Sequence, residues 1–123
     1  MTVTPETNAT LAEIASALLK RRRICICGHV NPDGDCIGST LALACALRAV
    51  GREVVTLVAG DVPAPRAFDF MPGFGGLMMA SELDAGAPAD AFVAVDVPND
   101  ERLGDEAAAL RDASAFTVTI DHH

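Results

Sequence analysis

Residues 24–35 read Ile-Cys-Ile-Cys-Gly-His-Val-Asn-Pro-Asp-Gly-Asp, and this stretch decides the fold. Its first four residues form a short apolar run with β-branched side chains, which predicts a buried strand that ends at Gly28. The turn-rich residues 29–35 follow. From Cys36 to Val50 the chain is apolar almost all round, which predicts a helix buried against a sheet. A strand, a polar loop and a buried helix in this order are typical of the first unit of an α/β fold.

Apolar segments alternate with helical ones on both sides of this stretch. The other predicted elements are helices over residues 11–19 and 105–112, strands over 53–59, 77–79, 91–95 and 116–120, and one helical turn near 67–70 within a loop over 60–76. Asn8 or Thr10 can cap the first helix. Apolar strands that alternate with helices predict a parallel sheet with helices on both faces. We expect residues 1–10 to form a flexible N-terminus and residues 11–123 to form one domain.

Composition and charge argue against some classes of function. The 123 residues carry a net charge of -8, which argues against a nucleic-acid binder that uses a broad basic face. Five Phe and no Tyr or Trp leave little for a base-stacking platform. A small anionic substrate stays compatible, because bound cations can invert the local field. The sequence shows no apolar run of membrane length and no signal peptide, so we expect a cytoplasmic protein without membrane contact.

The four cysteines are Cys25, Cys27, Cys36 and Cys45. Cys25 and Cys27 lie two residues apart in an apolar run and would share one face of a strand. A Cys-x-Cys pair can form half of a zinc site, but the sequence offers no second cluster to complete it. We therefore expect all four to be buried, reduced thiols.

Polar side chains gather after three of the predicted strands. They are His29, Asp33 and Asp35 after the first strand, Asp96 after the strand over 91–95, and Asp121, His122 and His123 after the last. Because the C-terminal ends of parallel strands meet at one edge of a sheet, we expect these groups to share a site. Each alone has an ordinary role as a turn residue, a helix cap or a solvated tail. Together they favour a metal site of carboxylates and imidazoles, which suits Mn²⁺, with Mg²⁺, Co²⁺ or Zn²⁺ as competitors.

These segments resemble the first three motifs of the DHH phosphoesterase superfamily. The motifs are His-Val-Asn-Pro-Asp-Gly-Asp at residues 29–35, Asp96, and Asp-His-His at residues 121–123. The superfamily includes the RecJ exonucleases, the manganese-dependent family II inorganic pyrophosphatases and the nanoRNA/pAp phosphatases. The resemblance covers the chain from Ile24 onward. It implies a first metal ion bound by His29 and Asp33, a second bound by Asp35 and His122, and Asp96 as the ligand that bridges both.

The resemblance also implies residues that act on the substrate. His123 resembles a histidine that contacts the substrate phosphate, and Asp121 resembles a carboxylate that orients the imidazoles. Residues 100–104 and 70–73 resemble segments of the nanoRNA/pAp phosphatase branch. We also expect Arg102 to bind the substrate, because it follows the end of a predicted strand and so lies on the same side of the sheet as the metal ligands.

The activity implied is hydrolysis of phosphate esters in short RNA oligonucleotides or in 3′-phosphoadenosine 5′-phosphate (pAp). Water activated by two Mn²⁺ ions, or by Co²⁺ or Mg²⁺ in their place, would be the nucleophile. A pyrophosphatase or exopolyphosphatase-like hydrolase is the alternative within the superfamily. A non-catalytic metal or nucleotide sensor built on the same fold is the alternative from a different class of function. A flavodoxin-like or dinucleotide-binding module is disfavoured, because no Gly-x-Gly-x-x-Gly follows the first strand.

Two features depart from the superfamily pattern. Residues 97–99 read Val-Pro-Asn where small polar residues are common in the nanoRNA/pAp branch. Members of the superfamily also continue past the Asp-His-His motif with a fourth-motif aspartate for the second ion and a C-terminal substrate-binding domain. We therefore expect this chain to be an N-terminal DHH domain, truncated at that motif and inactive alone. A homodimer of the full-length form is left open.

Overall fold

The computed structural model describes residues 8–83 and 89–122. The described strands form one parallel sheet in the order β3-β2-β1-β4-β5. They are β1 (Arg23–Cys27), β2 (Glu53–Val58), β3 (Met78–Met79), β4 (Ala91–Val95) and β5 (Phe116–Ile120). The α/β class and the parallel sheet are confirmed, and β4 and β5 have the predicted bounds.

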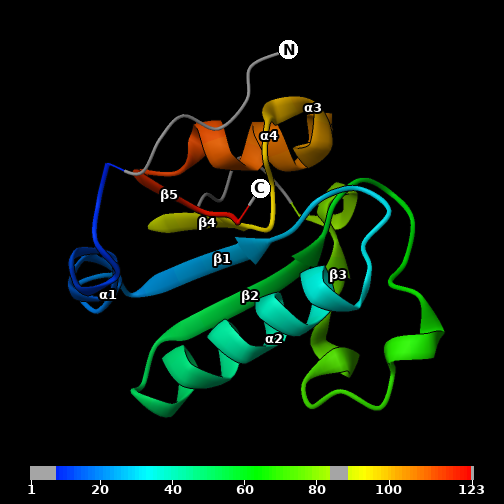
Figure 1. The fold of residues 1–123 in the computed structure, drawn as a ribbon, viewed down its shortest axis with the longest axis horizontal. Coiled ribbons are helices and arrows are strands. Elements are labelled where there is room, and N and C mark those ends of the chain that lie inside the picture. Colours follow the sequence, from blue (N-terminus) through cyan, green and yellow to red (C-terminus); the bar gives the residue numbers. More distant parts are fainter. Residues whose placement is uncertain (1–7, 84–88, 123) are drawn as a thin grey trace.

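Helices cover both faces of this sheet, as Figure 1 shows. The α-helices are α1 (Leu11–Leu18), α2 (Gly34–Ala49), α3 (Asp100–Leu103) and α4 (Asp105–Ala113). Three short 3₁₀ segments are η1 (Arg66–Phe68), η2 (Phe74–Gly76) and η3 (Ala80–Glu82). Helix α2 packs on β1 and β2, whereas α4 packs near β4 on the opposite face. The predicted helices on both faces are thus confirmed.

Alternating side chains on the central strands build a core on each face. The core beneath α3 and α4 includes Cys25, Cys27, Phe92, Ala94, Leu103, Ala107 and Leu110. The core beneath α1 and α2 includes Leu18, Ile24, Ile26, Ala44, Leu47, Ala91 and Val93. Because β1 and β4 are buried on both faces, each reads in the sequence as a continuous apolar run.

The order of the strands positions the site. From β1 the chain moves outward to β2 and β3, and then returns to β4 on the other side of β1. The connections after β1 and β4 therefore diverge to opposite sides, which leaves a crevice at the C-terminal ends of these strands. The segments that follow β1, β4 and β5 meet at this edge, where the sequence predicted that the polar side chains would gather.

Helix α2 differs from the prediction in two ways. It begins at Gly34 rather than Cys36, because the Asp33 side chain accepts a hydrogen bond from the Cys36 amide and caps the helix. Asp35 therefore lies in the first helical turn and not in a loop. The helix is also not buried all round, since Cys45 on its outer side is exposed. This corrects the prediction of four buried thiols, although the other three cysteines are free and buried.

Smaller differences occur at other element ends. Thr10 caps α1 in a capping box with Glu13, as one of the two predicted caps. Residues 1–7 of the expected flexible N-terminus lie outside the described residues. The one-turn helix α3 was not predicted, and it begins where the Asn99 side chain accepts a hydrogen bond from the Arg102 amide. Within the described part of the chain, no helix has the length and apolarity needed to cross a membrane.

Candidate metal centre

Asp96 lies at the centre of the site, directly after β4. It is 5% exposed, and its backbone φ of 60° is a left-handed conformation that is uncommon outside glycine. The Asp96 amide donates to the Ile120 carbonyl at 2.8 Å, which ties this backbone to the end of β5. Its two carboxylate oxygens face different imidazoles. Oδ2 lies 3.3 Å from His29 Nε2, and Oδ1 lies 2.7 Å from His122 Nε2.

His29 follows β1, is buried, and has a defined tautomer. Its Nδ1 lies 2.7 Å from the Val30 carbonyl oxygen. A carbonyl only accepts hydrogen bonds, so Nδ1 carries the proton and donates it. Nε2 then presents its lone pair towards Asp96 Oδ2 and towards Asp33 Oδ1, which is 3.7 Å away. This is the tautomer that a histidine needs in order to bind a metal ion through Nε2.

The first turn of α2 brings two more carboxylates to this edge. The Cys36 amide donates to Asp33 Oδ1 at 2.9 Å, and this bond lowers the pKa of the Asp33 carboxyl. Asp35 Oδ2 lies 3.2 Å from His122 Nε2. The structure thus places close together the five residues predicted to bind metal, which are His29, Asp33, Asp35, Asp96 and His122.

The lone pairs of these groups fit cations placed between them. His29 Nε2 and Asp96 Oδ2 are both electron-pair donors and lie 3.3 Å apart, so they repel unless a proton or a metal ion lies between them. Asp35, Asp96 and His122 each offer one ligand atom, and the three atoms lie within 4.8 Å of one another. Three carboxylates and two imidazoles suit divalent ions that take oxygen and nitrogen ligands. The residues present therefore fit the expected ions.

Cys36 is a residue of this site that the sequence analysis did not recognise. Its thiol lies with His29 and Asp96 in a buried group whose three potential ligand atoms are within 4.8 Å of one another. Burial above all, helped by the nearby carboxylates, raises the pKa of this thiol to about 12. The capping signal of Asp33 would have placed Cys36 in the first turn of α2, beside the other ligands.

Arg102 lies on α3 against the back of the His29 ring. Its Nη2 is 3.3 Å from His29 Nδ1. Because Nδ1 donates to the Val30 carbonyl, the guanidinium cannot donate to Nδ1, and it is a positive charge beside the ring. The Val30 amide in turn donates to the Arg102 carbonyl at 2.7 Å, which ties α3 to the segment after β1. Arg102 is therefore close to the site, while its contact with substrate stays a prediction.

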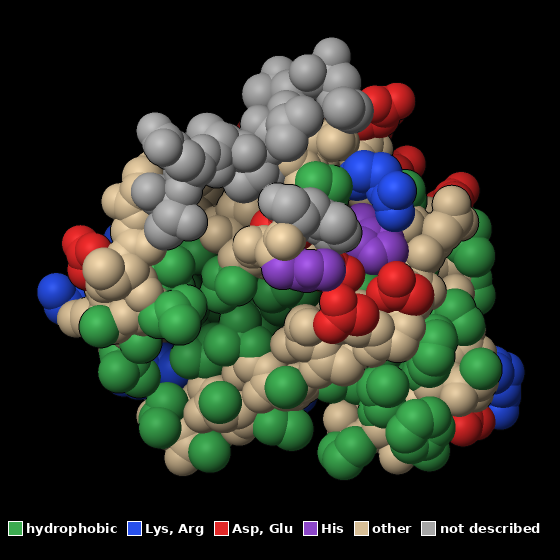
Figure 2. All heavy atoms as spheres, in the orientation of Figure 1, with side chains coloured by type: hydrophobic (Ala, Val, Ile, Leu, Met, Phe, Trp, Pro, Cys, Tyr) green, Lys and Arg blue, Asp and Glu red, His purple; other side chains and the backbone are tan. Residues whose placement is uncertain are grey.

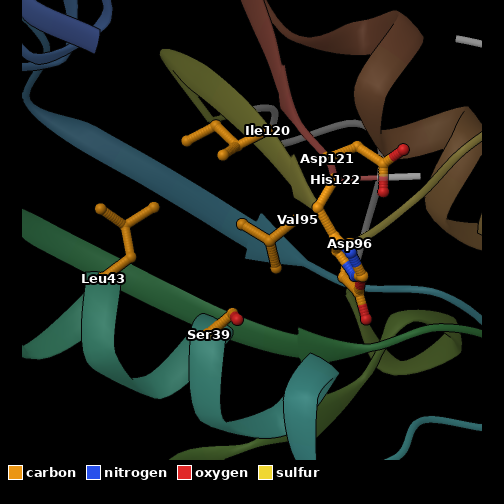
Figure 3. Close-up of a pocket in the computed structure, with 7 residues that line it drawn as sticks. All are labelled: Ser39, Leu43, Val95, Asp96, Ile120, Asp121 and His122. Atoms are coloured by element: carbon orange, nitrogen blue, oxygen red, sulfur yellow. The ribbon is translucent and has the colours of Figure 1, made fainter.

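A groove of about 320 Å³ opens beside the metal ligands. It is lined by Ser39, Leu43, Val95, Asp96, Ile120, Asp121 and His122. Asp96, Asp121 and His122 lie together at one end of it (Figure 3). Figure 2 shows histidine and acidic side chains side by side on this face, next to a stretch of hydrophobic side chains. Asp121 is partly buried at this end, and its role in orienting the imidazoles stays a prediction. His123, the predicted substrate contact, lies outside the described residues.

Comparisons with known proteins agree on one family. The profile of the DHH family, N-terminal domain, matches residues 23–123. The bifunctional oligoribonuclease and PAP phosphatase NrnA of Thermus thermophilus is 32% identical over 100 residues, which cover 81% of this chain and 28% of that protein. The crystal structure of an exopolyphosphatase-related protein from Bacteroides fragilis matches with a TM-score of 0.76 and 29% identity, over 91% of this chain and 34% of that one. The chain thus spans about a third or less of the length of these relatives. It belongs to the DHH family, and the matching part is the N-terminal domain of that family.

Proposed function

We propose that this chain is the metal-binding domain of a phosphoesterase that hydrolyses phosphate esters of short RNA oligonucleotides or of pAp. The observation that carries the proposal is the buried carboxylate of Asp96, whose two oxygens face two imidazoles that follow different strands. A carboxylate in this position can be shared by two ions. A purely structural ion pair would need only one histidine, and it would not need two further carboxylates at the start of α2.

The proposed ligands divide into two overlapping sets. His29, Asp33 and Asp96 would hold the first ion, and Asp35, Asp96 and His122 would hold the second. We propose Mn²⁺ as the ion, with Co²⁺ or Mg²⁺ as alternatives. When bound, two such ions supply the Lewis acidity that activates water and neutralises charge on a phosphate.

The chain itself orients these ligands through backbone hydrogen bonds. The Val30 carbonyl fixes the tautomer of His29, the Cys36 amide holds the Asp33 carboxylate, and the Ile120 carbonyl holds the backbone of Asp96. Ligands that are already oriented lose less conformational freedom when they bind. Around them, we propose that His123 contacts the substrate phosphate, that Asp121 orients the imidazoles, and that Arg102 adds positive charge for an anionic substrate.

The names of the relatives support the proposed class of substrate. The Thermus relative is described as an oligoribonuclease and PAP phosphatase, and the segments at residues 70–73 and 100–104 resemble that branch. A second candidate is hydrolysis of pyrophosphate or polyphosphate, because the structural relative is described as exopolyphosphatase-related. Since both relatives are much longer than this chain, we propose that segments outside the N-terminal DHH domain discriminate between these substrates.

Turnover by the full-length protein tests this proposal. We expect hydrolysis of pAp and of a dinucleotide but not of pyrophosphate, with the highest rates in Mn²⁺ or Co²⁺, lower rates in Mg²⁺ and none in Ca²⁺. The matched control is Asp96→Asn, which keeps the size of the side chain and removes its charge. Turnover of pyrophosphate alone would favour the second candidate. Metal binding without turnover of any of the three substrates would favour a non-catalytic sensor, and activity in excess chelator would exclude the metal centre.

A further inference from the structure

A sulfur atom lies next to the proposed first metal position. The side chains of His29, Cys36 and Asp96 each place one potential ligand atom within 4.8 Å of the other two. All three residues are at most 5% exposed. In a tetrahedral zinc site, bonds of about 2.3 Å to sulfur and about 2.1 Å to nitrogen place the two ligand atoms roughly 3.6 Å apart, which lies within this limit of 4.8 Å. Small side-chain movements would therefore bring all three donors onto one ion.

The thiol of Cys36 is held in this place by its surroundings. A Cβ atom at Gly28 would overlap with Cys36 Sγ, so the sulfur occupies space that only a glycine at the end of β1 leaves open. Thr40 Oγ1 donates to the Cys36 carbonyl at 2.9 Å within α2. The sulfur therefore cannot swing away from the metal ligands without disturbing the packing of α2 on β1.

We propose that Cys36 Sγ acts with His29 and Asp96 as a third ligand for thiophilic divalent ions, so that this position selects Cd²⁺ or Zn²⁺ over Mn²⁺ or Mg²⁺. The inference rests on the metal centre of the proposed function and adds a selectivity to it. Thiolate sulfur favours soft and borderline ions, whereas Mn²⁺ and Mg²⁺ take oxygen ligands. When the sulfur–metal bond forms, the thiol loses its proton to solvent, and no oxidation occurs.

Mn²⁺ prefers oxygen and nitrogen ligands, so it can bind His29 and Asp96 without using the sulfur of Cys36. The second set of ligands, Asp35, Asp96 and His122, contains no sulfur. The two positions of one site should therefore differ in the ions that they select.

Titration of the 123-residue chain with Co²⁺ and Cd²⁺ tests this inference by spectroscopy. We expect a near-ultraviolet sulfur-to-metal charge-transfer band that saturates at one ion per chain. Cys36→Ser should abolish the band and weaken Cd²⁺ binding by at least about tenfold, because a lost ligand costs at least as much as a lost supporting residue. It should leave the affinity for Mn²⁺ unchanged. Cys45→Ser, on the exposed side of the same helix, is the matched control and should keep both the band and the affinity.

The outcomes separate this inference from the proposed function. If Co²⁺ and Cd²⁺ bind without a sulfur band, or if the band survives in Cys36→Ser, the role of Cys36 is wrong while the metal centre stands. If no divalent ion binds, the metal centre itself is wrong. Cadmium NMR of the unsubstituted chain needs no variant, so a folding defect in Cys36→Ser would not block the test. A resonance in the range of sulfur-ligated cadmium is expected, and one in the range of oxygen and nitrogen ligands alone would overturn the inference.

Discussion

The two halves of the candidate metal centre differ in how firmly their side chains are held. In the inner half, just after β1 and β4, the side chains of His29 and Asp96 are 6% and 5% exposed. In the outer half, on α2 and after β5, the side chains of Asp35 and His122 are 61% and 66% exposed. The sheet explains this contrast for the residues that follow its strands, His29, Asp96 and His122, because β1 and β4 are interior strands whereas β5 is an edge strand.

This contrast predicts unequal binding of two ions. A buried ligand that is already oriented loses little freedom when the ion arrives, whereas an exposed side chain must first be ordered. We therefore infer that the inner half binds its ion tightly, together with Asp33, whose exposed side chain is held by the Cys36 amide. The outer half should bind weakly in this chain. For the same reason, and because its relatives are longer, we expect the chain alone to hydrolyse nothing measurable.

The largest effect is expected from Asp96→Asn, which removes the carboxylate shared by both halves. Asparagine has nearly the same size and tolerates the left-handed backbone at this position, so the fold should persist. We expect the affinity for Mn²⁺ to fall by at least about a hundredfold, the upper range for loss of a group that supports a metal site. Calorimetric titration measures the affinity, and far-ultraviolet circular dichroism checks the fold. A change of only a few-fold would show that Asp96 does not bridge the two positions.

The next largest loss of Mn²⁺ affinity should come from only one of the two histidines. Mn²⁺ titration of the unsubstituted chain should give a stoichiometry near one, and His29→Ala should weaken that binding by about ten- to a hundredfold. His122→Ala should change it little, because its imidazole belongs to the outer half. Asp33→Ala should drive the stoichiometry towards zero. Two ions bound with similar affinity, or equal losses in both histidine variants, would contradict the contrast between the halves.

The sequence predicted the inner half of the site better than the details of its surroundings. Strands β4 and β5 were predicted residue for residue, because doubly buried or edge strands give short runs that are rich in β-branched side chains. Knowing where parallel strands end was enough to place His29, Asp96 and His122 at one edge. These predictions needed only local patterns and one rule of topology.

The features that local sequence patterns did not reveal depend on side-chain geometry. The turn-like residues 31–34 hid the fact that Asp33 caps α2, so the helix was predicted to begin two residues late. The apolar composition of α2 hid its exposed side, because alanine and cysteine tolerate either environment. The position of the Cys36 sulfur depends on the missing side chain of Gly28, which is a contact between two elements that no local pattern encodes.

The reactivity of the thiols allows another comparison, between Cys36 near the start of α2 and Cys45 near its end. Cys45 is exposed, whereas burial raises the pKa of Cys25 to about 11 and that of Cys36 to about 12. Burial also raises the pKa of Cys27 well above its usual value. At about pH 8, where an ordinary thiol is partly ionised, we expect iodoacetamide to modify only Cys45 in the native chain. Mass spectrometry should show one adduct before unfolding in urea and four afterwards, and rapid native labelling of Cys36 would contradict its burial.

The smallest effects on substrate binding are expected from two arginine substitutions. Arg102 lies beside His29, and Arg21, at the opposite edge of the sheet, is its control. In the full-length protein, Arg102→Ala should raise the KM for pAp, because it removes the positive charge beside His29. Arg21→Ala should leave both the KM and the affinity for Mn²⁺ unchanged. Equal effects of the two substitutions on KM would mean that the charge acts over the whole molecule rather than at the site.

Arg21 should instead affect stability, and only slightly. Its guanidinium lies 4.4 Å from the centre of the Phe116 ring and 3.2 Å from Asp90. Arg21→Ala should lower the free energy of unfolding by about 0.5–1 kcal/mol, mainly through the lost ring contact.

The Arg22 amide, and then Arg21, lower the pKa of the Asp90 carboxyl. Asp90 therefore stabilises the fold above its unfolded pKa of about 3.9 and loses this contribution as the pH falls through its lower folded pKa. In urea unfolding, the difference between the unsubstituted chain and Asp90→Asn should be present at pH values near neutrality and shrink in acid. A difference that instead grows as the pH falls would show that Asp90 is not stabilised in its charged form.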